Sequence, residues 1–238
     1  VLSLALFAGG IAAHLYPKIA PRLCPLRFRG DRFSPALWIA LLGFGGAWGI
    51  QGALFGHIPH ITDATSHCFQ AQVFAAGHLS APAPPCPPAF FQHNVIISPS
   101  GLWHAKYFPG QALWLAGPWR SVAMPLAFFI FLLASHRIAS RYFGAAVAHV
   151  ATLLLSVSPL LLLLAASFMS HTTLLMWMAL CWAFLLSALE ATASGRILYR
   201  AALSGFCVGM GTLTRPQDAA LFALFMLAAI WPLLRKNA

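Results

Sequence analysis

Long apolar runs separated by short polar connectors dominate the chain. A helix needs about 20 mostly apolar residues to cross the hydrocarbon core of a bilayer. Seven runs are candidate spans by that measure: 1–16, 35–55, 121–139, 143–165, 171–190, 198–214 and 217–234. They lack the alternation of membrane β-strands, which favours helices over a barrel. The expected fold is all-α: a polytopic transmembrane helical bundle of about 6–7 spans, with residues 1–238 as a single transmembrane domain.

One of these runs is interrupted. Pro159 lies inside the run 143–165. Proline removes a backbone donor and clashes with the preceding turn, so it kinks or ends a helix. We therefore expect the second half of this run to bend or re-enter instead of continuing straight.

The composition excludes a soluble globular enzyme. The 238 residues are 60% hydrophobic and 8% charged, and the only acids are Asp31, Asp63, Glu190 and Asp218. A soluble domain normally carries about a quarter charged residues. This composition cannot cover a water-facing surface, so the sequence predicts an integral membrane protein.

The basic residues predict its orientation. Eleven of the fourteen Lys and Arg residues fall in the connectors 17–34, 136–142 and 191–200 and in the C-terminal tail. The positive-inside rule makes that side cytoplasmic, and the segment 56–120 then lies on the opposite face of a bacterial-type inner or plasma membrane. A nucleic-acid partner is not expected, because the basic residues are scattered over short connectors without interleaved aromatic residues.

The long outer loop 56–120 is rich in aromatic residues and histidine, which argues against disorder. Its part 62–78 is expected to form a short interfacial helix with Asp63, His67 and Gln70 on one face. The five prolines of the stretch 82–88 predict extended backbone. The aromatic residues of 102–119 are typical of a belt at the level of the lipid headgroups.

Asp63 is the only acid in this loop. It can cap the following helix, or it can act as a general base toward a hydroxyl nucleophile at the membrane surface. Lys106 and Arg215 are two of the three basic residues of the same side, the third being Arg120, and either of the two can hold a phosphate or simply contact outer headgroups. A local ion pair between Arg215 and Asp218 is an equally good interpretation.

Histidine and cysteine leave two weaker hypotheses. Six histidines occupy the outer region, yet no HxxxH or CxxC spacing appears, so a dedicated metal site is the less favoured interpretation. Cys68 and Cys86 are the only cysteines that share the outer side, and so the only plausible disulfide pair. Both hypotheses require a geometry that the sequence does not contain.

Four short motifs resemble those of a known family. They are PHITDATSHCFQAQVFAAGHLSAPAPP, GLWHAKYFPGQALWLAG, SFMSHTTLL and LTRPQDAAL, in this order. Together they resemble the GT-C membrane glycosyltransferases, specifically the family-39-like group related to aminoarabinose transferases and protein O-mannosyltransferases. The resemblance covers roughly residues 35–234. Where many relatives carry Asp-Glu, this chain has Asp63–Ala64, and relatives usually continue into further spans and an outer domain, so we interpret the chain as an N-terminal fragment.

The resemblance implies a function. Such enzymes take a sugar from a polyprenyl-phosphate donor and transfer it to an envelope lipid, glycan or protein acceptor on the non-cytoplasmic face. It implies Asp63 as the catalytic acid, with Lys106 and, less strongly, Arg215 at the donor phosphate. His67, Gln70, Tyr107 and His171 are supporting candidates. No metal ligands are assigned, and a divalent cation remains an open question.

Two other functions remain open. A transporter or channel would use the break at Pro159 around a substrate site, although the spans carry almost no ionisable residues. A structural membrane subunit would use its His-rich outer loop to sense a metal.

Overall fold

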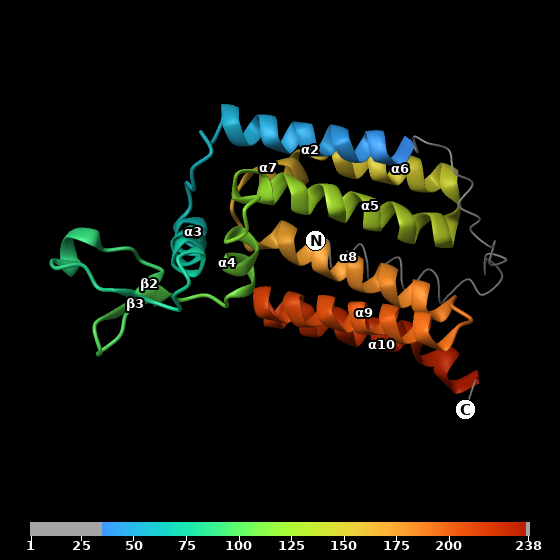
Figure 1. The fold of residues 1–238 in the computed structure, drawn as a ribbon. Coiled ribbons are helices and arrows are strands. Elements are labelled where there is room, and N and C mark those ends of the chain that lie inside the picture. The colour runs from blue at the N-terminus through green and yellow to red at the C-terminus, as the bar shows by residue number, and fades with distance from the viewer. Residues whose placement is uncertain (1–34, 237–238) are drawn as a thin grey trace.

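The computed structural model describes residues 35–236, which are mostly helical (Figure 1). Seven helices lie in or along the bundle: α2 (Pro35–Ala53), α5 (Ala123–Phe143), α6 (Ala145–Ser156), α7 (Pro159–Ala166), α8 (Ser170–Leu189), α9 (Ser194–Thr214) and α10 (Pro216–Lys236). When α6 and α7 are counted as one bent element, successive elements of the bundle run in opposite directions, so the connections fall at two ends. The segment 56–122 lies at one end, together with the α7–α8 and α9–α10 turns. We call residues 56–122 the lobe.

Part of the predicted set of spans is confirmed. Four helices are long and apolar enough to cross a membrane: α2, α5 together with the short helix before it, α8 and α9. Helices α6 and α7 form a fifth candidate, bent by 59° at a break just before Pro159. The bend confirms the expected effect of that proline, which occupies the first turn of α7.

The expected number of about six to seven spans is not reached within residues 35–236. The run 217–234 corresponds to α10, of which the part Pro216–Ala228 is a shorter apolar helix and is not counted among these spans. The predicted span 1–16 lies outside the described residues. The described part of the chain therefore has four candidate spans, or five with the bent pair.

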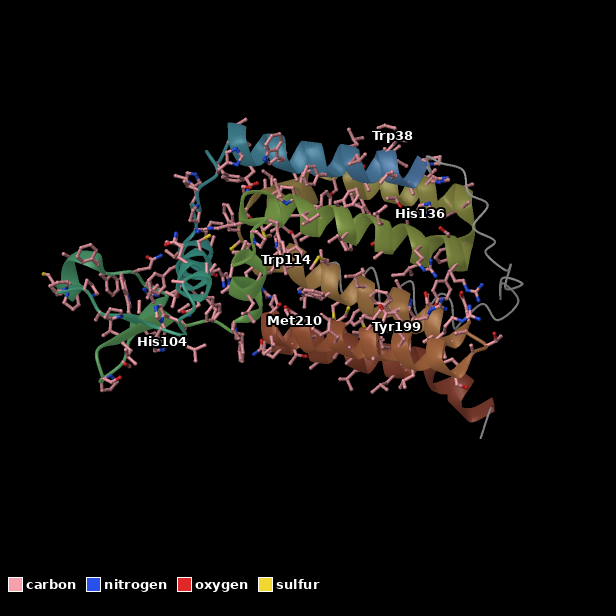
Figure 2. The ribbon with its side chains drawn as sticks, in the orientation of Figure 1. Trp38, His104, Trp114, His136, Tyr199 and Met210 are labelled. Carbon is pink, nitrogen blue, oxygen red and sulfur yellow. The ribbon has the colours of Figure 1, made fainter. Side chains whose placement is uncertain are left out.

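Small and aromatic residues hold the bundle together. Phe128 and Leu132 of α5 and Met176 of α8 are fully buried, and they pack with alanines of α2 such as Ala40. Small residues on α2 let the helix backbones approach closely, which favours van der Waals packing between membrane helices. Large apolar side chains such as Trp38, which Figure 2 labels on the outer side of α2, point away from the bundle. These exposed faces are suited to contact with lipid.

Arginines tie the helices together at the end away from the lobe. Arg141 of α5 forms an ion pair with Glu190 at the end of α8. Ser187 accepts hydrogen bonds from Arg137 through its side chain and from Arg200 through its backbone carbonyl, at 2.8 and 2.6 Å. The described basic connectors thus gather at one end of the bundle, as the charge pattern predicts.

The lobe corrects the expectation of a purely helical fold. It contains α3 (Thr62–Ala75), β1 (Ala81–Pro82), the 3-10 turn η2 (Pro87–Phe90), β2 (Val95–Ile97), β3 (Leu102–Ala105), α4 (Gly110–Leu115) and the 3-10 turn η3 (Arg120–Val122). Its strands form an antiparallel sheet of order β1-β3-β2. The short interfacial helix is confirmed as α3. The proline stretch is extended only in part, because η2 begins at Pro87.

Helix α4 joins the lobe to the bundle. Trp114 lies at this junction in Figure 2, and its indole N–H donates to the carbonyl oxygen of Ala123 at 2.9 Å. Its ring meets Trp177 of α8 edge to face, with centroids 5.9 Å apart. A second cluster of buried residues, including Ala64, Leu115 and Met124, continues this contact beneath α3. The lobe is therefore packed on the bundle.

Candidate functional site

Asp63 lies in the first turn of α3, where the residue at the cap position is Ile61. Its carboxylate Oδ1 accepts a hydrogen bond from the side-chain Nδ2 of Asn94 at 2.7 Å and a longer one from the hydroxyl of Thr62 at 3.4 Å. The interpretation of Asp63 as the helix N-cap is therefore wrong. Its charge still complements the helix dipole, because acids in the first turn face the positive end.

Tyr107 and His67 complete the surroundings of this carboxylate. The hydroxyl of Tyr107 hydrogen-bonds to Asp63, and burial together with this contact raises the pKa of Tyr107 to about 12. The rings of Tyr107 and His67 lie 5.0 Å apart between centroids. Burial lowers the pKa of His67 to about 4, with Asp63 opposing the shift and Arg215 and His171 adding to it. His67 is therefore a neutral imidazole at neutral pH.

Arg215 organises a second group of side chains at the α9–α10 turn. Its Nε binds the carboxylate of Asp218 at 2.5 Å, and its Nη1 lies 3.1 Å from His171 Nε2 and 3.5 Å from the hydroxyl of Ser170. A guanidinium only donates, so His171 Nε2 must accept and the ring proton sits on Nδ1. This Nδ1 is buried without a hydrogen-bond partner within residues 35–236. The predicted pair of Arg215 with Asp218 is confirmed.

A close backbone contact joins these two groups. A Cβ added at Gly110 would lie 2.6 Å from the backbone nitrogen of Thr214 and 2.5 Å from its hydroxyl. Only glycine lets the turn containing Lys106 and Tyr107 approach the end of α9, next to Arg215, this closely. The glycine of the KYFPG motif is thus explained by packing.

Gln70 and Lys106 differ in their surroundings. Gln70 is buried, and its side chain accepts from the backbone N–H of Ala105 and donates to the carbonyl of Leu79, both at 2.8 Å. It fixes β3 against α3, and both polar atoms of its amide are engaged in this structural role. Lys106 is exposed, and its ammonium forms no ion pair with the part of the chain that the structure describes.

The structure thus brings most of the predicted site residues to one end of the bundle. Asp63, His67 and Tyr107 are in contact, and His171 contacts Arg215.

Asn94 is a residue of this site that the sequence did not predict. No pattern in the sequence separates it from the other amide side chains of the loop, because its role depends on a contact across 31 positions.

The metal and disulfide hypotheses receive no support. Across the described residues, no three His, Cys, Asp or Glu side chains are grouped closely enough to hold a metal ion. Cys68 and Cys86 are both free, the first buried in α3 and the second exposed. Burial raises the pKa of the Cys68 thiol to about 11, against the opposing effect of Arg120. The proposed pair is therefore not a disulfide in this structure.

Two shallow grooves lie on the lobe on either side of Phe69, with volumes of about 320 and 330 Å³. The ring of Phe69 packs against Trp103 with centroids 4.7 Å apart. Neither groove is lined by Asp63, Lys106 or Arg215. The candidate site therefore lies outside both grooves.

Comparison with known proteins identifies no relative. No family model matches the chain, no curated protein matches it, and no solved structure matches it. The class that the fold itself defines is a helical membrane protein with a mixed helix and strand lobe at one end.

Proposed function

We propose that the protein is a membrane glycosyltransferase of GT-C type, which moves a sugar from a polyprenyl-phosphate donor to an acceptor on the non-cytoplasmic face. The observation that carries the proposal is the convergence of a carboxylate, a neutral imidazole and two cations at one end of an apolar bundle. A lipid-linked donor keeps its polyprenyl chain in the bilayer, so a site at the end of the bundle suits it. The membrane would be an inner or plasma membrane, with the lobe outside.

Asp63 is the base in this proposal. An acceptor hydroxyl attacks the anomeric carbon of the sugar, a new C–O bond forms, and the bond from that carbon to the phosphate oxygen breaks. The electron pair leaves with the phosphate, and Asp63 takes the hydroxyl proton. Asn94, Thr62 and Tyr107 occupy part of its hydrogen-bonding capacity, and a carboxylate has about four lone-pair sites, so one stays available for the acceptor.

The cations act on the leaving phosphate. Lys106 is exposed and carries an unpaired ammonium, within the described residues, close to Tyr107. Arg215 still has an Nη2 group for an anion after its contacts through Nε and Nη1. Charge-assisted hydrogen bonds to phosphate are stronger than neutral ones, and they stabilise the charge that develops as the bond breaks.

The test is sugar transfer by the purified protein in lipid vesicles that contain a polyprenyl-phosphate sugar. We expect Asp63→Asn to lower the rate at least about 100-fold, the scale of general base catalysis. Glu190→Gln is the matched control, because it removes one acid at the far end of the bundle and should keep most of the rate. Retained transfer in Asp63→Asn would refute the assignment of the base.

A transporter is the second candidate function, and the 59° bend between α6 and α7 is the observation that favours it. Broken helices in transporters often frame a substrate site near the middle of the bilayer. Solute flux in vesicles without any sugar transfer would support this function and contradict the transferase.

A further inference from the structure

Asn94 occupies a buried position between α3 and β3. Only 4% of its surface is exposed. Its backbone carbonyl accepts hydrogen bonds from the hydroxyl of Ser66 at 2.6 Å and from the backbone N–H of Lys106 at 3.0 Å. The backbone of this residue is thus fixed on both sides before its side chain makes any contact.

The side chain turns toward the acid. Its Nδ2 donates to Asp63 Oδ1 at 2.7 Å and to the hydroxyl oxygen of Thr62 at 3.2 Å. The opposite orientation of the amide would place its oxygen against a carboxylate oxygen, and the two would repel each other. The hydrogen-bond network therefore assigns the donating orientation.

We infer that Asn94 is a positioning residue for Asp63. It fixes the rotation of the carboxylate and sets the distance between that carboxylate and the backbone of Lys106. The contact itself is independent of the reaction, but the catalytic consequence rests on the proposed glycosyl transfer. Hydrogen bonds to a charged group contribute more than neutral ones, so this bond has the larger effect of the two that the Asn94 side chain makes.

The other groups that face Asp63 remain when Asn94 is changed. They are the neutral His67 on α3, the hydroxyl of Tyr107 from the turn before α4, and His171 at the start of α8, while Arg215 acts on His67 from the end of α9. A change in the NMR signal of the Asp63 carboxylate in an Asn94 variant can therefore be assigned to the lost amide once these groups are shown to be unmoved.

The experiment uses two readouts on the full chain in lipid nanodiscs. Carboxyl-carbon NMR of the labelled protein follows the aspartates directly, and the chain contains only three of them, Asp31, Asp63 and Asp218. The assignment comes from the signal that disappears in Asp63→Asn. We expect Asn94→Leu to change the chemical shift of this signal and to broaden it, because the carboxylate loses the charge-assisted hydrogen bond that fixes its rotation.

The second readout is the steady-state kinetics of sugar transfer. We expect Asn94→Leu to lower kcat about 10-fold and to leave the KM for the donor unchanged. Gln92→Ala is the matched control, since it removes the neighbouring hydrogen bond from Gln92 to the carbonyl of Thr62 without touching Asp63. The control should shift neither readout.

Asn94→Asp is the second variant, because it keeps the shape of the side chain and the backbone contacts if Asn94→Leu does not fold. It removes the donor and places a second carboxylate beside Asp63, so the Asp63 signal should again change its chemical shift and broaden. An unchanged Asp63 signal in a folded Asn94 variant overturns the inference. If the wild-type protein transfers no sugar, the proposed function fails, while the Asp63 signal still decides the positioning role.

Discussion

Replacing Gly110 by alanine should separate the lobe from the end of α9. Gly110 is the first residue of α4, and an added Cβ would lie 2.5 Å from the Thr214 hydroxyl and 2.6 Å from both the Leu213 carbonyl carbon and the Thr214 nitrogen. Ordinary contact begins at 3.4 Å. The three atoms are therefore about 0.8 Å too close, and two of them belong to backbone that cannot rotate away.

The magnitude follows from two opposing effects. Alanine is favoured over glycine in a helix by roughly 0.5–1 kcal/mol, which on its own would stabilise the variant. Overpacking against a fixed backbone costs about 1–3 kcal/mol. The steric cost is larger, so we expect a net destabilisation of about 1–2 kcal/mol, which corresponds to a melting temperature lower by about 5 °C in a chain of this size.

The rate of sugar transfer in Gly110→Ala should fall by more than the lower stability of the variant alone would cause. The turn that holds Lys106 and Tyr107 moves with Gly110, whereas Arg215 stays with α9. Misplacing catalytic groups by about 1 Å can cost roughly 100-fold in rate. We therefore expect sugar transfer to fall by one to two orders of magnitude at a temperature where the variant remains folded.

The assay is thermal denaturation of the detergent-solubilised protein, together with transfer in vesicles. Gly49→Ala is the matched control, because a Cβ at this position in α2 meets no atom within 4 Å and should raise the melting temperature slightly. Adding Thr214→Ala to Gly110→Ala removes the hydroxyl contact and leaves both backbone contacts, so it should restore little. A Gly110→Ala variant that melts and transfers like the wild type would refute the close approach.

Three further predictions use other contacts. Gln70→Leu leaves the backbone groups of Ala105 and Leu79 without partners, so the melting temperature should fall by the equivalent of about 2–4 kcal/mol. The lowered pKa of His67, about 4, means that the unfolded chain binds more protons between pH 6.5 and 4, so stability should fall as the pH drops through this window. The contribution of His67 to the pH dependence of the free energy of unfolding, up to about 3 kcal/mol, should be absent in His67→Phe, as measured by thermal melting at a series of pH values. In a Cys24→Ser background, a membrane-impermeant maleimide should label exposed Cys86 from outside intact cells without denaturant; labelling only after lysis would contradict the proposed orientation.

The apolar pattern was enough to predict the bundle, and the polar pattern was not enough to predict the lobe. The helices α2, α5, α8 and α9 follow from apolar run length alone, and the break before Pro159 follows from the chemistry of proline. The strands β2 and β3 contain three and four residues, too short for a period-two pattern to be distinguished from loop sequence. Their pairing depends on Gln70, which supplies the hydrogen bond to β3 from a helix.

The residues of the candidate site could likewise be predicted only in part from the sequence. Asp63 and His67 could be predicted to share a face, because the helical repeat fixes that relation within one element. Only the resemblance to a family indicated that Tyr107 belongs to the same site, and nothing in the sequence indicated Asn94. The contacts of Tyr107 and of Asn94 with Asp63 each join two separate elements, which no local pattern predicts. The periodic pattern within one helix or strand does not show which residues far apart in the sequence are in contact.

The partners of the acids show why Asp63 is the residue on which the proposed chemistry depends. Glu190 pairs with Arg141, and Asp218 pairs with Arg215, so each of these carboxylates is neutralised by a guanidinium. Each of these two carboxylates therefore already has a charged partner in the folded chain. The hydrogen bonds to Asp63 come instead from neutral groups, the amide of Asn94, the hydroxyl of Thr62 and the phenol of Tyr107. Within residues 35–236 it is the one acid whose carboxylate forms no ion pair, which makes it the acid best suited to accept a proton during a reaction.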